Sequence, residues 1–251
     1  MANGVTKFRE FFGDYKDQYV VIGGTACDLL MEQSGFDFRL TKDIDMVLVV
    51  EALTDDFSNK FWKFIEAGGY TARRKKTGKP EFYRFVNPTE PGYPTMIELF
   101  ARPDNKVDFE YKGNIVPIHL GEEISSLSAI LLNNDYYQFL LDGRVEVDGI
   151  MVLKASHIVP LKMKAWLDLT ETKGKGEHVN DRDLRKHRLD VFRMFPIVDI
   201  SRTVLVPDQV YNDIMSFIEA MNDMSYDLKN IGIDIDMVDI LDEYSKLYIK
   251  K

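Results

Sequence analysis

The sequence contains little cysteine and histidine, and it has no long apolar run. Its 251 residues include a single cysteine, Cys27, and four histidines. One cysteine excludes an intrachain disulfide and suits a reducing compartment, and we expect Cys27 to be a small buried residue rather than a nucleophile. No apolar segment approaches the roughly 20 residues of a membrane span, and the first residues lack the apolar core of a signal peptide. The sequence therefore predicts a cytoplasmic protein outside the membrane.

Positive charge is also in deficit. Lys and Arg number 32 against 41 Asp and Glu, which gives a formal net charge of −9 and a pI near 5.0. This balance argues against a general nucleic-acid coat, because phosphate binding needs a cationic footprint. A local basic patch stays open, since residues 73–79 are either a solvated hairpin end or a contact for a polyanion such as RNA. A hydrophobic content of 45% is that of an ordinary globular chain.

Two aspartates, Asp43 and Asp45, stand at the start of an apolar, β-branched run over residues 43–50. Such a run predicts a buried strand. Side chains alternate along a strand, so both carboxylates would lie on one face, with Cα atoms about 6.5–7 Å apart. Protonation, solvent or a cation must relieve their repulsion, and Mg²⁺ is often held by one or two carboxylates plus substrate phosphates. Alone, such a pair is more often a solvated loop edge, so its surroundings must decide.

A glycine turn precedes this acidic strand. Residues 19–22 predict a short buried strand, Gly23 and Gly24 end it, and a helix is expected to start with Thr25 near its cap. Glycine permits close backbone approach, and free N–H groups at a helix start attract phosphate. For the glycines alone, a plain tight turn is the alternative. Together with the acidic strand they predict a phosphate cradle beside two metal-binding carboxylates.

A third carboxylate, Glu98, interrupts the apolar strand predicted over residues 95–100. An unpaired charge would be costly to bury there, so a partner is expected. That partner is either an arginine, such as Arg84 or Arg102, or a metal ion shared with the two aspartates. The sequence leaves both choices open.

The remaining patterns predict an α+β fold, with a mixed β-sheet domain flanked by helices over residues 1–153 and a helical C-terminal domain over residues 154–251. Asp148 and Gly149 are a hairpin turn signal between the last two strands. Helices are expected near residues 5–15, 55–68, 124–132, 157–169, 181–192, 207–221 and 236–248, and further strands at 70–72, 82–86, 116–120, 136–141, 144–147 and 150–153.

The string Asp-Ile-Asp-Met occurs twice, at residues 43–46 and at residues 234–237. The second copy runs into apolar residues at helical spacing and has no glycine turn beside it. Its aspartates are expected to be helix-capping and first-turn charges, which favour the helix dipole. The four letters alone therefore do not define a site.

The glycine turn, the Arg-x-Thr-x-Asp-x-Asp stretch over residues 39–45 and Glu98 resemble the nucleotidyltransferase superfamily, which has the fold of DNA polymerase β. The closer resemblance is to the AbiEii-like nucleotidyltransferase toxins of bacterial type IV toxin–antitoxin systems. Residues 162–165 resemble the helical lysine motif of that group, and residues 182–187 resemble its late Lys-Asp-Leu motif. The sequence departs from the pattern of that family. Gly24 stands where Ser is common, and Arg182 stands in place of Lys before Asp-Leu.

The resemblance implies transfer of a nucleoside monophosphate from an NTP to an unidentified acceptor. Asp43 and Asp45 would hold Mg²⁺ against the β- and γ-phosphates, and Glu98 would complete a second metal site or act as general base. The site would thus take one or two Mg²⁺ ions. In the lysine motif, Lys162 would neutralise triphosphate charge, with Lys164 as the alternative, and Asp183 would orient the triphosphate or the acceptor. The implied nucleotide-binding residues are Gly23, Gly24, Thr25, Arg39, Thr41 and Lys162.

RNA is one candidate acceptor, and a cognate antitoxin is one candidate protein partner. Two other functions stay open: a catalytically silent module that binds nucleotide or a partner protein, and a small-molecule adenylyltransferase of the antibiotic-modifying kind. Retention of three mutually repulsive carboxylates argues against the silent module. Basic residues at 73–79 and 182–188 favour a polyanionic acceptor, whereas the net charge of −9 opposes it.

Overall fold

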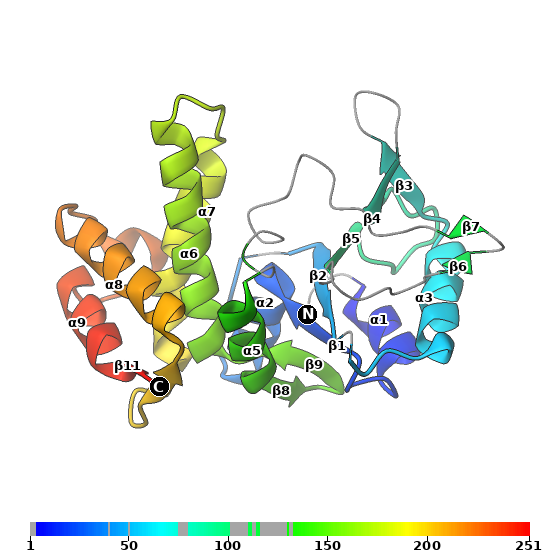
Figure 1. Cartoon of the computed structure of the whole chain (residues 1–251), viewed down its shortest axis with the longest axis horizontal. Coiled ribbons are helices and arrows are strands. Elements are labelled where there is room, and N and C mark those ends of the chain that lie inside the picture. The colour runs from blue at the N-terminus through cyan, green and yellow to red at the C-terminus, as the bar shows by residue number, and fades with distance from the viewer. Residues whose placement is uncertain are drawn as a thin grey trace. The chain divides into compact units, whose positions relative to one another are not determined.

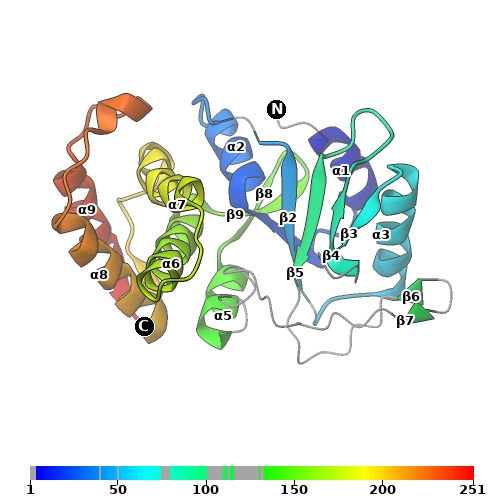
Figure 2. The same cartoon turned by 90° about the horizontal axis from the view of Figure 1, so that it is seen from above.

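The computed structural model describes residues 4–39, 41–49, 51–74, 80–100, 110–111, 114–115, 130 and 133–251. The chain forms two compact units (Figures 1 and 2). The first unit comprises Met1–Ile124 and Arg144–Leu153, and the second comprises Ser125–Gly143 and Lys154–Lys251. Helices and a mixed sheet are both present, which confirms the predicted fold class at that level.

A mixed sheet, seven-stranded over the described residues, forms the centre of the first unit in the order β3-β4-β5-β2-β1-β9-β8. The strand β2 pairs in parallel with β5, and β1 pairs in parallel with β9, whereas the other neighbours are antiparallel. The acidic strand β2 therefore lies between two partners. The strands are β1 (Tyr19–Ile22), β2 (Asp43–Leu48), β3 (Thr71–Arg74), β4 (Pro80–Val86), β5 (Met96–Phe100), β8 (Arg144–Val147) and β9 (Ile150–Leu153), and β6 (Glu110–Tyr111) pairs separately with β7 (Asn114–Ile115).

Helices cover both faces of this sheet. Figure 2 shows α1 (Val5–Phe12) and α3 (Asp55–Ala67) on one face and α2 (Gly23–Gln33) on the other. Aromatic rings fill the layer under α1 and α3, where edge contacts between rings and their large buried area stabilise the packing. The rings of this cluster are Phe8, Phe12, Tyr19, Phe57, Phe61, Phe64 and Phe85. The acidic side chains of β2 lie on the opposite face of the sheet, under α2.

The second unit is mainly helical. In this unit α6 packs against α7 and α8, and Tyr244 on α9 donates a hydrogen bond of 2.8 Å to the carbonyl of Val191 on α7. None of the described helices combines the length and the apolar composition that a membrane span needs. The elements of the second unit are α5 (Asn134–Asp142), α6 (Ala155–Gly174), α7 (Asp181–Arg193), α8 (Asp208–Asn222), α9 (Met237–Leu247) and the parallel pair β10 (Val204–Val206) and β11 (Tyr248–Lys250).

One predicted element is wrong in type. Residues 136–141 were expected to form a strand because they are almost continuously apolar, but they lie in the helix α5. The side chain of Asn133 accepts hydrogen bonds from the backbone N–H groups of Asp135 and Tyr136, so an N-cap starts the helix there. The expected strand at residues 116–120 lies outside the described residues, as do residues 75–79 of the basic run and all but residue 130 of the expected helix at 124–132.

Candidate functional site

Strand β2 presents its two aspartates on the face that α2 covers. Asp43 and Asp45 are half-buried. Ile44 and Met46 alternate with them along β2 and are buried on the opposite face of the sheet, which packs against the aromatic rings. Asp45 lies opposite Ile22 of β1 and opposite Glu98 of β5 in the register of the sheet. Neighbouring strands are about 4.8 Å apart, and opposed residues point to the same face. Asp45 and Glu98 are therefore adjacent. Asp43 lies on the same face, two residues before Asp45 in β2.

The glycine turn approaches the acidic strand at Gly23. This residue has φ +71°, a left-handed conformation that favours glycine. A Cβ atom at this position would overlap the Oδ2 atom of Asp45. The missing side chain thus lets the backbone at the start of α2 approach the Asp45 carboxylate directly.

Gly24 makes the corresponding approach to the segment just before β2. A Cβ atom at Gly24 would lie 2.5 Å from Cγ2 of Thr41 and 3.3 Å from Nη2 of Arg39. A side chain at Gly24 would therefore require Thr41 to move. Thr41 is buried, and its hydroxyl has no hydrogen-bond partner in the described part of the protein.

Thr25 lies within the first turn of α2 and not at its N-cap. The helix α2 begins at Gly23, and no side chain within the described residues caps its N-terminus. Thr25 instead donates a hydrogen bond of 2.5 Å to the backbone carbonyl of Asp43. The hydroxyl therefore ties the first turn of α2 to the first residue of β2.

Glu98 has an arginine partner, which is one of the two choices left open by the sequence. Arg84 on β4 lies opposite Glu98 in the sheet, and its Nη2 atom donates to Oε1 of Glu98 at 2.5 Å. Both side chains are largely buried, with 20% and 10% of their surfaces exposed. A row of side chains, Arg84, Glu98 and Asp45, thus crosses three adjacent strands on one face.

The oxygen donors of this face suit a hard divalent cation. Asp43 and Asp45 supply two carboxylates of the kind that hold Mg²⁺ together with phosphate oxygens. The buried hydroxyl of Thr41 and the start of α2 lie beside them and offer hydrogen-bond donors to an anion. Across the described residues, no three side chains of His, Cys, Asp or Glu stand together as a metal-binding group.

Lys162 lies in the second unit, on α6, where it forms a buried ion pair. Its Nζ atom is 3.2 Å from Oδ2 of Asp190 on α7, and Arg193 approaches the other oxygen of Asp190 at 3.2 Å. Asp190 is fully buried. Asp190 was not predicted as a site residue, although it carries the signal that singled out Glu98, since an acidic residue stands beside the apolar Leu189, Val191 and Phe192.

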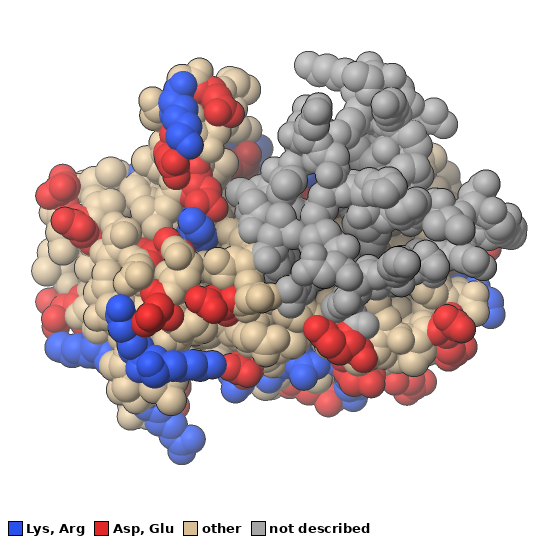
Figure 3. All heavy atoms as spheres, viewed as in Figure 1, with Lys and Arg blue, Asp and Glu red and all other residues tan. Residues whose placement is uncertain are grey.

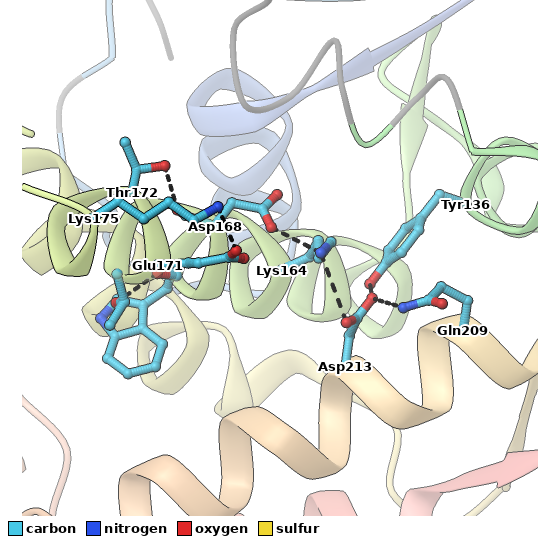
Figure 4. Close-up of polar contacts among 10 residues, drawn as sticks. Tyr136, Lys164, Asp168, Glu171, Thr172, Lys175, Gln209 and Asp213 are labelled. Carbon is cyan, nitrogen blue, oxygen red and sulfur yellow. Dashed lines mark hydrogen bonds and ion pairs between the residues drawn. The ribbon is translucent and has the colours of Figure 1, made fainter. Parts of the chain in front are cut away.

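Lys164 belongs to a separate polar network on the other side of α6 (Figure 4). Its Nζ atom lies 2.8 Å from Asp168 and 3.8 Å from Asp213 on α8. Tyr136 and Gln209 also donate to Asp213, at 2.9 Å and 3.1 Å. Burial lowers the pKa of Lys164, but the hydrogen bond and charge of Asp168 outweigh it and leave the pKa above its ordinary value. Lys164 is thus held as a cation.

The acidic residues that the sequence singled out in the second unit are exposed, namely Asp183, Asp234 and Asp236. Asp183 lies in the first turn of α7, where its charge favours the helix dipole. The ion pair of Lys162 is with Asp190, two turns further along the same helix. Asp236 occupies the N-cap position of α9 as predicted, but its side chain makes no capping hydrogen bond.

The surface in Figure 3 mixes both signs of charge over the described part of the face shown, where Lys and Arg side chains lie among Asp and Glu.

No family model matches the chain, and none of the curated proteins matches it either.

Proposed function

We propose that the chain is a Mg²⁺-dependent nucleotidyltransferase that moves a nucleoside monophosphate from an NTP to an acceptor hydroxyl, and that its sheet unit has the nucleotidyltransferase-like fold. The observation that supports this most strongly is the approach of the glycine turn to the acidic strand. Gly23 lies against Asp45, and Gly24 lies against Thr41 and Arg39. A phosphate-binding helix start and a carboxylate pair are thereby neighbours within one unit.

The residues divide the work by their chemistry. The N–H groups at Gly23 and Gly24, the hydroxyl of Thr41 and the guanidinium of Arg39 would bind the triphosphate oxygens. Asp43 and Asp45 would hold Mg²⁺, which supplies charge stabilisation for the phosphates when it is bound. Thr25 acts indirectly, because its hydrogen bond to the Asp43 carbonyl keeps β2 against α2.

The reaction itself is a displacement at the α-phosphorus. The acceptor oxygen forms a bond to the α-phosphorus, the bond to the bridging oxygen breaks, and pyrophosphate leaves. The acceptor proton must go to a base, and Glu98 is the candidate next to Asp45. RNA and small hydroxyl compounds both stay open as acceptors.

The decisive assay uses NTPs labelled at either the α- or the γ-phosphate. With Mg²⁺ and a mixture of RNA and small-molecule acceptors, the α label should move to an acceptor and the γ label should appear in pyrophosphate. Asp45→Asn keeps the shape of the side chain and should lower the rate by about a hundredfold or more. Transfer that needs no divalent ion, or that is unchanged in this variant, would contradict the proposal.

The role of the helical lysines needs a second readout. Lys162 pairs with the fully buried Asp190, so its loss should also lower stability. We therefore compare Lys162→Gln and Lys164→Gln in the transfer assay and in thermal unfolding. A loss of transfer without a matching loss of stability would assign the triphosphate role to that lysine. Asp183→Asn, at an exposed position, serves the same purpose for the acidic residue of the late motif.

A catalytically silent nucleotide-binding module is the second candidate, and the ion pair between Arg84 and Glu98 favours it. The pair engages the carboxylate that would otherwise be the general base or the third metal ligand. This alternative predicts that NTP binds with Mg²⁺ but that neither label moves. Equilibrium dialysis with labelled NTP beside the transfer assay separates the two candidates.

A further inference from the structure

The row Arg84, Glu98 and Asp45 has a consequence for how many cations the site can take. The backbone fixes the row, since Arg84 lies opposite Glu98 and Glu98 lies opposite Asp45 in the sheet register. On the other face of β4, Phe85 is buried against the rings of Phe61 and Trp62. This packing holds β4 in place and keeps Arg84 directed to the acidic face.

The charge of Glu98 is already compensated before any cation binds. The guanidinium of Arg84 donates to Glu98 at 2.5 Å, and only 10% of the Glu98 side chain is exposed. Charge-assisted hydrogen bonds between arginine and carboxylate are strong, more so with limited access to water. A divalent ion that takes Glu98 as a ligand must therefore displace Arg84 or bind against its positive charge.

We propose that Arg84 is a positioning residue that takes the place of a second divalent cation at Glu98, so that the free site binds one divalent ion, at Asp43 and Asp45. This inference rests on the proposed function, because it assumes that the two aspartates hold a metal. In this scheme Arg84 forms an ion pair with Glu98, the candidate base. It acts through Glu98, whose carboxylate it holds beside Asp45.

A Mn²⁺ titration of the full chain without nucleotide tests the inference. Free Mn²⁺ is measured by electron paramagnetic resonance, which gives the number of ions bound per chain and their affinity. The wild type should bind one ion. Arg84→Gln should bind a second ion, with an affinity for that ion at least about tenfold higher than in the wild type, the equivalent of one charge-assisted hydrogen bond. Arg84→Lys keeps the charge and should bind one ion.

Two controls separate the site from a general change in charge. Arg9→Gln removes an arginine that pairs with Asp148 elsewhere in the same unit, and this variant should bind Mn²⁺ like the wild type. Arg84→Gln combined with Glu98→Gln removes the carboxylate as well and should return the count to one ion. Circular dichroism of each variant checks that the fold is retained.

The outcomes also separate this inference from the proposed function. If Arg84→Gln binds Mn²⁺ like the wild type, or if the wild type already binds two ions with similar affinity, the inference about Arg84 is wrong while the metal site stands. If neither the wild type nor any variant binds Mn²⁺, both the inference and the proposed function are overturned.

Discussion

The same four residues, Asp-Ile-Asp-Met, occupy two different environments in this protein. In the first copy, residues 43–46 form the start of a central strand, with half-buried aspartates beside a glycine turn. In the second, residues 234–237 lead into α9, and both aspartates are exposed. The difference shows that the residues around the string, rather than the string itself, determine whether it forms a strand or leads into a helix.

A glycine with a left-handed backbone conformation lies near each copy, and the two glycines differ in their surroundings. Gly23 has φ +71° and lies against Asp45, whereas Gly232 has φ +80°, and no atom of the described residues lies within 4 Å of where its Cβ would be. The first glycine is required by both conformation and space. The second is required by conformation alone. This contrast supplies matched controls for most of the tests below.

The largest expected effect is on nucleotidyl transfer. Replacing Asp43 and Asp45 together by alanine should lower the Mg²⁺-dependent rate by about a thousandfold, because the carboxylates that hold the cation are lost. Replacing Asp234 and Asp236 by alanine removes the same charges from the second copy and should leave the rate unchanged. Equal effects of the two double variants in the labelled NTP assay would remove the distinction between the copies.

The next effect is on stability. Gly23→Ala should lower the free energy of unfolding by about 3 kcal/mol, since it combines left-handed strain with overlap of the new methyl group and Asp45. Gly232→Ala adds only the strain and should cost about 1 kcal/mol. Urea unfolding followed by tryptophan fluorescence measures both. A smaller loss at Gly23 than at Gly232 would mean that Asp45 does not lie against the turn.

Divalent ions should stabilise the protein through the first copy only. At about a hundredfold excess over its dissociation constant, a bound cation contributes about 2.7 kcal/mol, which raises the melting temperature by several degrees. The shift should vanish in Asp43→Asn with Asp45→Asn and persist in Asp234→Asn with Asp236→Asn. Differential scanning calorimetry with and without Mn²⁺ measures it, and a shift that follows the second copy would contradict the assignment.

The smallest expected effect concerns how the first copy is held in place. Thr25→Val removes the hydrogen bond to the Asp43 carbonyl and should cost about 1 kcal/mol, while also weakening NTP binding. Thr172→Val removes a hydroxyl that donates at 2.8 Å to the carbonyl of Asp168, and it should leave NTP binding unchanged. If both variants bind NTP equally well, Thr25 does not position the site.

The sequence predicts the local parts of this fold because their signals are local. The apolar runs of β1 and β2 are strands, and the Asp148-Gly149 turn joins β8 to β9 as expected. Residues 136–141 are predicted wrongly because an apolar run without clear periodicity fits a buried strand or a helix, and the capping role of Asn133 decides between them. The parallel pair β10 and β11 was not predicted, since its strands are short and distant in sequence.

The candidate site is predicted only in part for a related reason. Strand pairing joins residues far apart in the chain, so the alternation of Asp43 and Asp45 follows from sequence but the neighbour of Asp45 does not. An acidic residue in an apolar strand indicates that Glu98 has a partner, yet only the register with β4 selects Arg84. The partner of Lys162 likewise depends on how two helices pack.

The most direct test of a cation site at Asp43 and Asp45 is paramagnetic broadening of amide resonances by substoichiometric Mn²⁺ in the isotope-labelled protein. The amides of Gly23, Gly24 and Asp45 should broaden first, because a cation on Asp43 and Asp45 would lie beside them. The amides of Gly232 and Asp236, beside the second copy, should keep their intensity. Equal broadening at both copies, or broadening at the second copy alone, would contradict the claim that the glycine turn makes the first copy a cation site.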